Sequence, residues 1–294
     1  MNPLQLTGER QAVWSATANR LKARYSGTRS IAFALSITGA FLAVLASQRP
    51  EGQVRLYLAI LSAVLFALVS FLTARVLGAQ RAMDWLRARV ASEALKREAF
   101  RHAATAAPYD DLATKDSRLN SERERIEEDV DDLIGYCVPS GLGSTPTETI
   151  TPDEYIERRI ERQINQFLEP KAAHNQRIAV SLRRAEFGLA LITTCITAIV
   201  GVAGKDPAGW GFDFVALTAV LTTVSGAILA HIEAGRYEFT ATNYRATARR
   251  LKNALVQRPA NFTAPSAEWS AFVNSCEAIL TEENNTWMAK WSKP

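Results

Sequence analysis

Hydrophobic residues are concentrated in four long uncharged runs, at residues 30–48, 56–74, 187–204 and 214–232. Each run has 18 or 19 residues, and a helix of that length spans about 30 Å, the thickness of the hydrocarbon core of a bilayer. A helix also pairs its own backbone polar groups, as lipid requires. Short polar loops join the first run to the second and the third to the fourth. We therefore expect an all-α integral membrane protein with four transmembrane helices in two hairpins.

The alternative for such a run is a buried helix of a soluble protein. Helices of that kind usually have about 10 to 14 residues and carry a polar stripe. Four uncharged runs of greater length favour membrane spans over this alternative.

The segments between the runs follow helical periodicity for most of their length. Residues 8–29 predict an amphipathic helix that leads into the first run. The pattern after the second run contains no proline and predicts one continuous helix as far as about His102. An acidic segment predicts a helix at residues 116–134, and residues 138–149, rich in Pro, Gly, Ser and Thr, predict a linker.

The second half of the chain contains well-marked helix signals. Residues 151–154, Thr-Pro-Asp-Glu, have the sequence of a capping box with proline at the first helical position. Pro170 interrupts the pattern that follows and predicts a kink or break ahead of the third run. Apolar residues at 237–255 recur at intervals of three and four residues, a heptad-like pattern typical of coiled-coil packing. A terminal helix is expected at residues 266–291, giving the spans long helical extensions and a C-terminal helix.

The order helix, span, loop, span and helix thus occurs twice. We expect a first two-transmembrane domain at residues 1–108, an acidic helix and linker at 109–150, and a second two-transmembrane domain at 151–294. Two spans in each copy give both copies the same orientation across the membrane.

The distribution of Lys and Arg near the span ends predicts that orientation. The two hairpin loops carry Arg49, Arg55 and Lys205. The segments outside the hairpins carry many more: Arg20, Lys22, Arg24, Arg29, Arg75, Arg81, Arg87, Arg89, Arg177, Arg183, Arg184, Arg236 and Arg245. We therefore expect a multi-pass protein of the inner membrane with both termini in the cytoplasm. These basic residues account for the net charge of +4, so we expect the lipid bilayer as a partner and no nucleic acid.

The sequence contains no pattern that suits catalysis or metal binding. Cys137, Cys195 and Cys276 are far apart and are expected to be reduced thiols. The three histidines share no metal spacing with one another or with the cysteines. Residues 201–206 lack the spacing of a phosphate-binding loop. We expect a protein that is not an enzyme and that holds no cofactor and no metal.

Small and hydroxylated residues recur every fourth position on the two spans of the second hairpin. They are Thr193, Thr197 and Gly201 on the third span, and Thr218, Thr222 and Gly226 on the fourth. One interpretation is close packing of helices through small residues. The other is a hydroxyl-lined path in an oligomer, because four spans of one chain are too few to enclose much water.

Spaced polar and aromatic residues around the second hairpin resemble the SLATT domains, two-transmembrane effectors associated with SMODS nucleotidyltransferases and SLOG domains. The residues before the hairpin that carry the resemblance are Tyr155, Arg159, Gln163, Phe167, Lys171, Ala172 and Asn175. Those in the terminal helix are Phe272, Val273, Glu277, Leu280, Glu283 and Trp287. The first half, with Trp85, Arg89, Glu93, Leu95 and Lys96 after its spans, is similar to a related SLATT type. The resemblance implies a tandem SLATT-domain protein.

The resemblance also implies a function. SLATT proteins are proposed effectors of bacterial anti-phage conflict systems, which oligomerise and permeabilise the inner membrane in abortive infection when a nucleotide-type signal appears. This sequence has no attached nucleotidyltransferase or SLOG domain, so we expect a separate sensor chain of that kind and a homo-oligomer. The alternative is a non-conducting membrane-anchored scaffold or receptor that binds a cytoplasmic partner.

Overall fold

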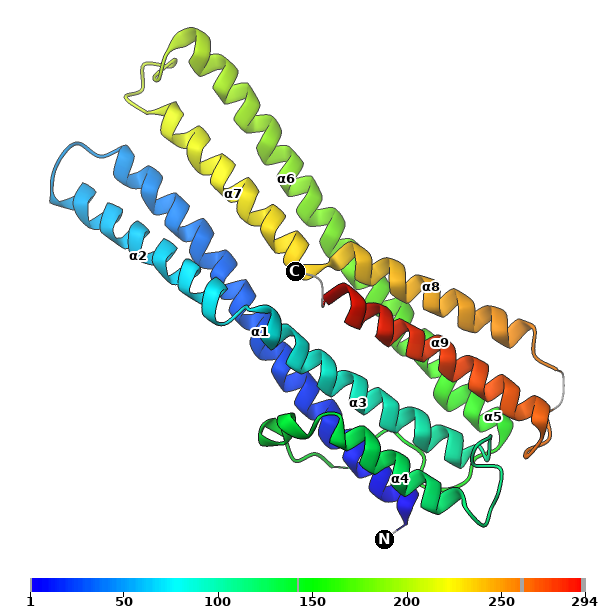
Figure 1. Cartoon of the computed structure of the whole chain (residues 1–294). Coiled ribbons are helices and arrows are strands. Elements are labelled where there is room, and N and C mark those ends of the chain that lie inside the picture. The colour runs from blue at the N-terminus through cyan, green and yellow to red at the C-terminus, as the bar shows by residue number, and fades with distance from the viewer. Residues whose placement is uncertain (1, 142, 260–261, 292–294) are drawn as a thin grey trace. The chain divides into compact units, whose positions relative to one another are not determined.

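The computed structural model describes residues 2–141, 143–259 and 262–291, and within them it contains helices and no strand (Figure 1). Residue 142 of the expected linker, residues 260–261 and the last three residues of the expected second domain lie outside this part. Four helices are long and apolar enough to cross a membrane: Pro3–Ser47, Gln53–Arg75, Pro152–Ala203 and Phe214–Val256. The all-α membrane fold with four spans is confirmed.

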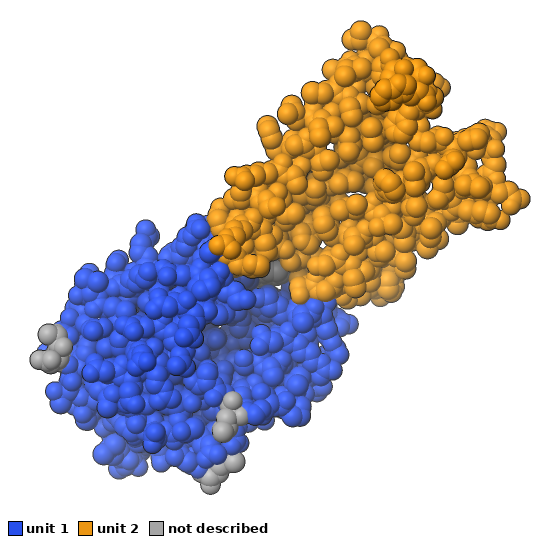
Figure 2. All heavy atoms as spheres, turned by 180° about the vertical axis from the view of Figure 1, so that it is seen from behind, with its two compact units in different colours: residues 1–24, 79–173, 241–294 blue, residues 25–78, 174–240 orange. Residues whose placement is uncertain are grey.

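The chain divides into two compact units, each assembled from both halves of the sequence (Figure 2). We call Tyr25–Gly78 and His174–Thr240 the span unit, because these segments contain the four apolar runs. We call Met1–Arg24, Ala79–Ala173 and Ala241–Pro294 the polar unit. This division follows compactness in space, whereas the repeat in the sequence follows chain order.

In the span unit, the end of helix α1 (Pro3–Ser47) forms a hairpin with α2 (Gln53–Arg75), and the end of α6 (Glu169–Ala203) forms one with α7 (Phe214–Gly235). The first hairpin is closely packed at Gly39. The hydroxyl of Ser62 donates a buried hydrogen bond of 2.8 Å to the Gly39 carbonyl. A Cβ atom at Gly39 would lie 3.4 Å from the Phe66 ring, so a branched side chain there would push the helices apart.

The two hairpins are joined through α1 and α7 at both ends of the span. At the end near the loops, the Gln48 side chain donates to the Asp213 carbonyl at 3.0 Å and accepts from the Asp213 amide at 2.8 Å. At the other end, Arg29 donates to the Ala234 carbonyl at 2.9 Å, which is one of the unpaired carbonyls at the C-terminus of α7. These contacts hold both hairpins in one unit.

The polar unit contains the beginning of α1, then α3 (Ala79–Ala103), α4 (Lys115–Glu128) and the 3₁₀ turn η1 (Asp131–Tyr136). It also contains α5 (Pro152–Tyr155), η2 (Ile156–Glu161), η3 (Gln163–Leu168), most of α8 (Tyr237–Val256) and α9 (Ala267–Trp291). A buried apolar cluster joins α1, α3 and α4, with Trp14, Leu95 and Ile126 among its members. On α9, the indole of Trp269 donates a 2.7 Å hydrogen bond to the Ala104 carbonyl at the end of α3. The polar unit is therefore a helical bundle with its own core.

The expectation of one helix from the second span to His102 is wrong. Helix α2 ends at Arg75 and α3 begins at Ala79. The amides of Val76 and Leu77 both donate to the Leu72 carbonyl, at 2.9 and 3.0 Å, which closes the last turn of α2. Gly78 follows, and glycine weakens a helix through its backbone entropy.

Of the kink or break expected at Pro170, the break is absent, since one helix runs from Pro152 to Ala203. It begins at the predicted capping box, in which the Thr151 and Glu154 side chains each accept from the other's backbone amide. The segments η2 and η3 are π-helical, and the amide of Glu169 donates to the Ile164 carbonyl five residues earlier. The wider π turn relieves the clash that a proline ring makes with the carbonyl four residues before it.

Candidate functional site

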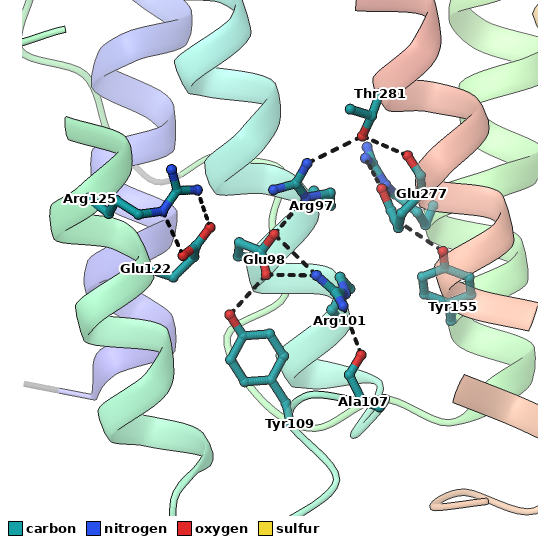
Figure 3. A network of polar contacts seen from close by, with 11 residues as sticks. Arg97, Glu98, Arg101, Ala107, Tyr109, Glu122, Arg125, Tyr155, Glu277 and Thr281 are labelled. Atoms are coloured by element: carbon teal, nitrogen blue, oxygen red, sulfur yellow. Dashed lines mark hydrogen bonds and ion pairs between the residues drawn. The ribbon is translucent and has the colours of Figure 1, made fainter. Parts of the chain in front are cut away.

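Three of the residues that carry the resemblance meet in a buried ion pair between η2 and α9. Arg159 donates from Nε and Nη2 to the two carboxylate oxygens of Glu277, at 2.8 and 2.7 Å. The Tyr155 hydroxyl donates to the same carboxylate at 3.0 Å (Figure 3). None of the three residues is more than 2 % exposed. A two-pronged contact of this kind is among the stronger hydrogen-bonded pairs in proteins.

The local sequence explains this arrangement. Tyr155 and Arg159 are four residues apart in the helix that follows the capping box, so they project from one face of it. Glu277 lies on α9 among Val273, Cys276 and Leu280, all of them buried. The carboxylate is thus carried into the core by an apolar helix face, where it requires a cation and hydrogen-bond donors.

Further charges of α3 surround the pair. Burial opposes ionisation of Glu93, yet Lys96, Arg159 and Arg89 hold its pKa below the ordinary value. Burial lowers the pKa of Lys96, and Glu93 partly offsets this effect. The Arg159 guanidinium also lies 5.2 Å from the centre of the Phe100 ring, within the range of a cation–π contact. The polar unit therefore contains a cluster of opposite charges across α3, η2 and α9, in which Arg159 and Glu277 are buried and Glu93 and Lys96 are partly exposed.

A second buried group lies further along α9. Glu283 is 5 % exposed, and its pKa is raised by burial although Arg89 opposes the shift. Trp287 packs with ring centres 6.1 Å from Trp85 and 6.0 Å from Tyr244. Two residues that carry the resemblance, Glu283 and Trp287, thus lie where α9 packs against α3 and α8.

Three further polar residues of the pattern lie outside these buried groups. Gln163 and Asn175 are partly exposed, and Lys171 is exposed on α6. They follow the same helix but do not join the Arg159–Glu277 pair.

Sequence reasoning missed a polar network centred on Glu98 of α3 (Figure 3). Glu98 is 2 % exposed and accepts from Arg97 at 2.5 Å, from Arg101 at 3.2 Å and from the Tyr109 hydroxyl at 2.9 Å. Arg97 also donates to Thr281 of α9 at 3.3 Å. The spacing of Arg97, Glu98 and Arg101 was a usable signal, because two arginines one turn apart beside a glutamate form a charged helix face.

Among the described residues, the threonine hydroxyls of the second hairpin bond within their own helices, and its two stripe glycines face open space. The hydroxyls of Thr193, Thr197, Thr218 and Thr222 each donate to a carbonyl of their own helix, at 2.7 to 2.9 Å. A Cβ atom at Gly201 or Gly226 would meet nothing within 4 Å. Within one chain, then, these stripes do not mediate the close helix contact that Gly39 makes in the first hairpin.

The described residues include no group of three or more His, Cys, Asp or Glu side chains that could hold a metal ion. All three cysteines are free. Burial raises the pKa of the Cys276 thiol to about 12, so little of the reactive thiolate exists at neutral pH.

Comparison with known proteins relates each half of the chain to a family. Residues 155–287 match the SMODS and SLOG-associating 2TM effector domain 1, SLATT_1. Residues 12–117 match a family of proteins of unknown function, DUF4231. No curated protein and no solved structure matches the chain significantly. The buried Tyr155, Arg159 and Glu277, together with Glu283 and Trp287, all lie within the first matched region. The second half of this multi-pass membrane protein is therefore a SLATT domain, a two-transmembrane effector domain.

Proposed function

We propose that this protein is a non-enzymatic effector that oligomerises in the bacterial inner membrane and permeabilises it in response to a nucleotide-type signal. The signal would come from a separate nucleotidyltransferase or SLOG-domain protein. Both termini and the polar unit would face the cytoplasm, as the basic residues outside the hairpins favour. The two matched regions would correspond to two two-transmembrane domains, at residues 1–108 and 151–294, separated by the acidic helix and linker at 109–150.

One observation carries the proposal. Helices α6 and α7 present polar stripes that their own chain leaves exposed, at Thr197, Gly201, Thr222 and Gly226. Small residues that have no packing partner within a chain suit close contact between chains in lipid, where apolar surface alone gives no drive for helix association. Because the hydroxyls are already paired within their helices, the same face can pack at rest and line a hydrated path in an oligomer.

Substitution of the stripe glycines tests this proposal with a matched control. Gly201→Leu and Gly226→Leu should disrupt oligomers and abolish depolarisation of cells that express the protein with its partner and trigger. Gly188→Leu is the control, because a Cβ atom there also meets nothing within 4 Å and the position lies on another face of α6. Membrane potential is read with a voltage-sensitive dye, and oligomer size by crosslinking in membranes.

The same experiment distinguishes the permeabilising effector from the alternative, a non-conducting scaffold. If well-expressed, membrane-embedded protein leaves the membrane potential unchanged under every trigger, the permeabilising function is wrong. Replacement of both hairpins by unrelated apolar helices should abolish activity of an effector, whereas a scaffold that uses its spans only as anchors would keep it.

A further inference from the structure

A wide basic pocket lies in the polar unit between α3 and α4. It measures about 610 Å³ and is lined by Arg97 and Arg101 of α3, Arg118 and Arg125 of α4, and two glutamates, Glu98 and Glu122. Figure 3 shows Arg125 and Glu122 of α4 facing Glu98 and Arg101 of α3. A pocket of this size holds a small organic ligand.

The lining has an excess of positive charge, four guanidinium groups against two carboxylates. Glu98 is buried and shared by Arg97 and Arg101, so one carboxylate serves two cations. Arg118 donates to the Pro108 carbonyl, a neutral acceptor. Arg125 pairs with Glu122 at 2.5 Å and, at the longer distance of 3.7 Å, with Asp129.

A further observation indicates that Arg125 is available to a ligand. The side chain of Arg125 is 57 % exposed, and an exposed ion pair such as Arg125–Glu122 contributes little to stability. Arg125 can therefore exchange Glu122 for another anion at low cost.

The positive charge of arginines on both helices also acts on Glu122 in the pocket. The hydrogen bond from Arg125 holds the pKa of Glu122 below its ordinary value, and Arg97 and Arg101 of α3 lower it further. Glu122 thus occupies a position where negative charge is stabilised from both helices. A ligand anion in the same place would gain the same interactions.

We propose that this pocket binds a phosphate-bearing anion, with the phosphates held by Arg97, Arg118 and Arg125. Guanidinium groups form paired hydrogen bonds with phosphate oxygens, and several arginines at one site suit a polyanion such as the diphosphate of a nucleotide. The bound anion would thus contact arginines of both α3 and α4. This inference rests on the proposed function, for which it supplies the place where a nucleotide-type signal is read.

Calorimetry of the full chain in detergent tests the pocket directly, with inorganic pyrophosphate as the probe and sulfate at equal ionic strength as the reference. The variant Arg118→Ala with Arg125→Ala should weaken pyrophosphate binding at least tenfold, because it removes two of the three guanidinium groups that hold the phosphates. The control variant Arg162→Ala with Lys252→Ala removes the same charge elsewhere in the polar unit. Lys252, like Arg125, takes part in an exposed ion pair, with Glu169, so the control should bind as the unaltered chain does. Glu122→Gln should bind several-fold more tightly, because it removes a competing anion.

Equal loss in both double variants, or no preference for pyrophosphate over sulfate, would overturn the proposal. Binding of a hexaglutamate peptide without binding of pyrophosphate would overturn it in favour of an acidic protein partner. Melting temperatures of all variants verify that they are folded. Because binding is measured without membrane flux, a chain that binds pyrophosphate but never depolarises cells would refute the proposed function alone.

Discussion

Two nitrogens on one edge of the Arg159 guanidinium, Nε and Nη2, donate to the carboxylate of Glu277 at 2.8 and 2.7 Å, and 118 residues separate the two side chains along the sequence. The pair fixes the helix that enters the third span against the terminal helix of the same domain. Both residues belong to the pattern by which the sequence resembles its family, and both are buried. The resemblance therefore marks a folding contact, which explains why these polar residues sit in otherwise apolar helix faces.

Removing one partner of this pair should destabilise the polar unit strongly. We expect Glu277→Gln to lower the free energy of unfolding by about 3 to 5 kcal/mol, because it leaves the buried Arg159 with only the more distant Glu93 carboxylate, 3.9 Å away, as a counter-charge. The double variant Arg159→Met with Glu277→Leu should recover much of this loss. Thermal unfolding in detergent measures both effects. The control Glu282→Gln breaks the exposed pair with Arg250 and should cost less than about 1 kcal/mol. Equal effects of Glu277→Gln and Glu282→Gln would contradict the assigned burial.

Glu283 should make stability depend on pH in the opposite direction to a salt-bridged carboxylate. Its folded-state pKa is raised by burial above the ordinary 4.5, so the folded chain holds its proton more tightly than the unfolded chain does. The stability from this proton is present below about 4.5 and is lost as the pH rises through the folded pKa. Glu283→Gln should therefore remove this dependence and stabilise the protein at neutral pH. Melting temperature as a function of pH measures the effect; a profile that Glu283→Gln leaves unchanged would contradict it.

The sequence predicted the elements that depend on local chemistry. The four spans follow from length and apolar composition, and the helix start at Thr151 follows from its capping box. The helix that continues through Pro170 and the helix that ends after Arg75 have a common explanation, since helix continuity there depends on backbone hydrogen bonds that shift by one residue. No pattern of side chains in the sequence marks the π-helical hydrogen bonds before Pro170 or the turn that closes on the Leu72 carbonyl.

The candidate sites were predictable only in part, for a related reason. Tyr155, Arg159 and Glu277 stood out as spaced polar residues, but their meeting is a tertiary contact between distant helices. The pocket beside Glu98 needed Tyr109 and α4 folded back along α3, and nothing in the periodicity of either helix gives that contact.

Gly39 should tolerate alanine but no branched side chain in the first hairpin. Gly39→Val would bring a branched side chain against the Phe66 ring, from which even a Cβ atom would be 3.4 Å away. We expect a loss of about 1 to 3 kcal/mol from overpacking. Gly188→Val in the second hairpin is the matched control, because its Cβ meets nothing within 4 Å. Unfolding of both variants in detergent compares them, and an equal loss would mean that helix propensity rather than packing dominates.

The orientation of the chain can be measured at two exposed positions. Trp210 is 78 % exposed in the loop of the second hairpin, where Asp206 fixes the turn by accepting from the amides of residues 210 and 211 at 2.9 and 2.7 Å. Val256, at the end of α8, is 84 % exposed. With both termini in the cytoplasm, a cysteine in place of Trp210 should react with a membrane-impermeant maleimide from outside the inner membrane. A cysteine in place of Val256 should react only after the membrane is opened.

The labelling uses a parent variant in which Cys137 and Cys195 are replaced by serine. This parent variant keeps Cys276, which is fully buried and has a pKa of about 12, so its thiol should not react with maleimide at neutral pH. The parent variant without an added cysteine serves as the control for Cys276. The reverse labelling pattern would place the hairpin loops inside the cell. The pocket of Arg97, Arg118 and Arg125 would then face away from any cytoplasmic signal, so this measurement bears on the proposed function as well as on the topology.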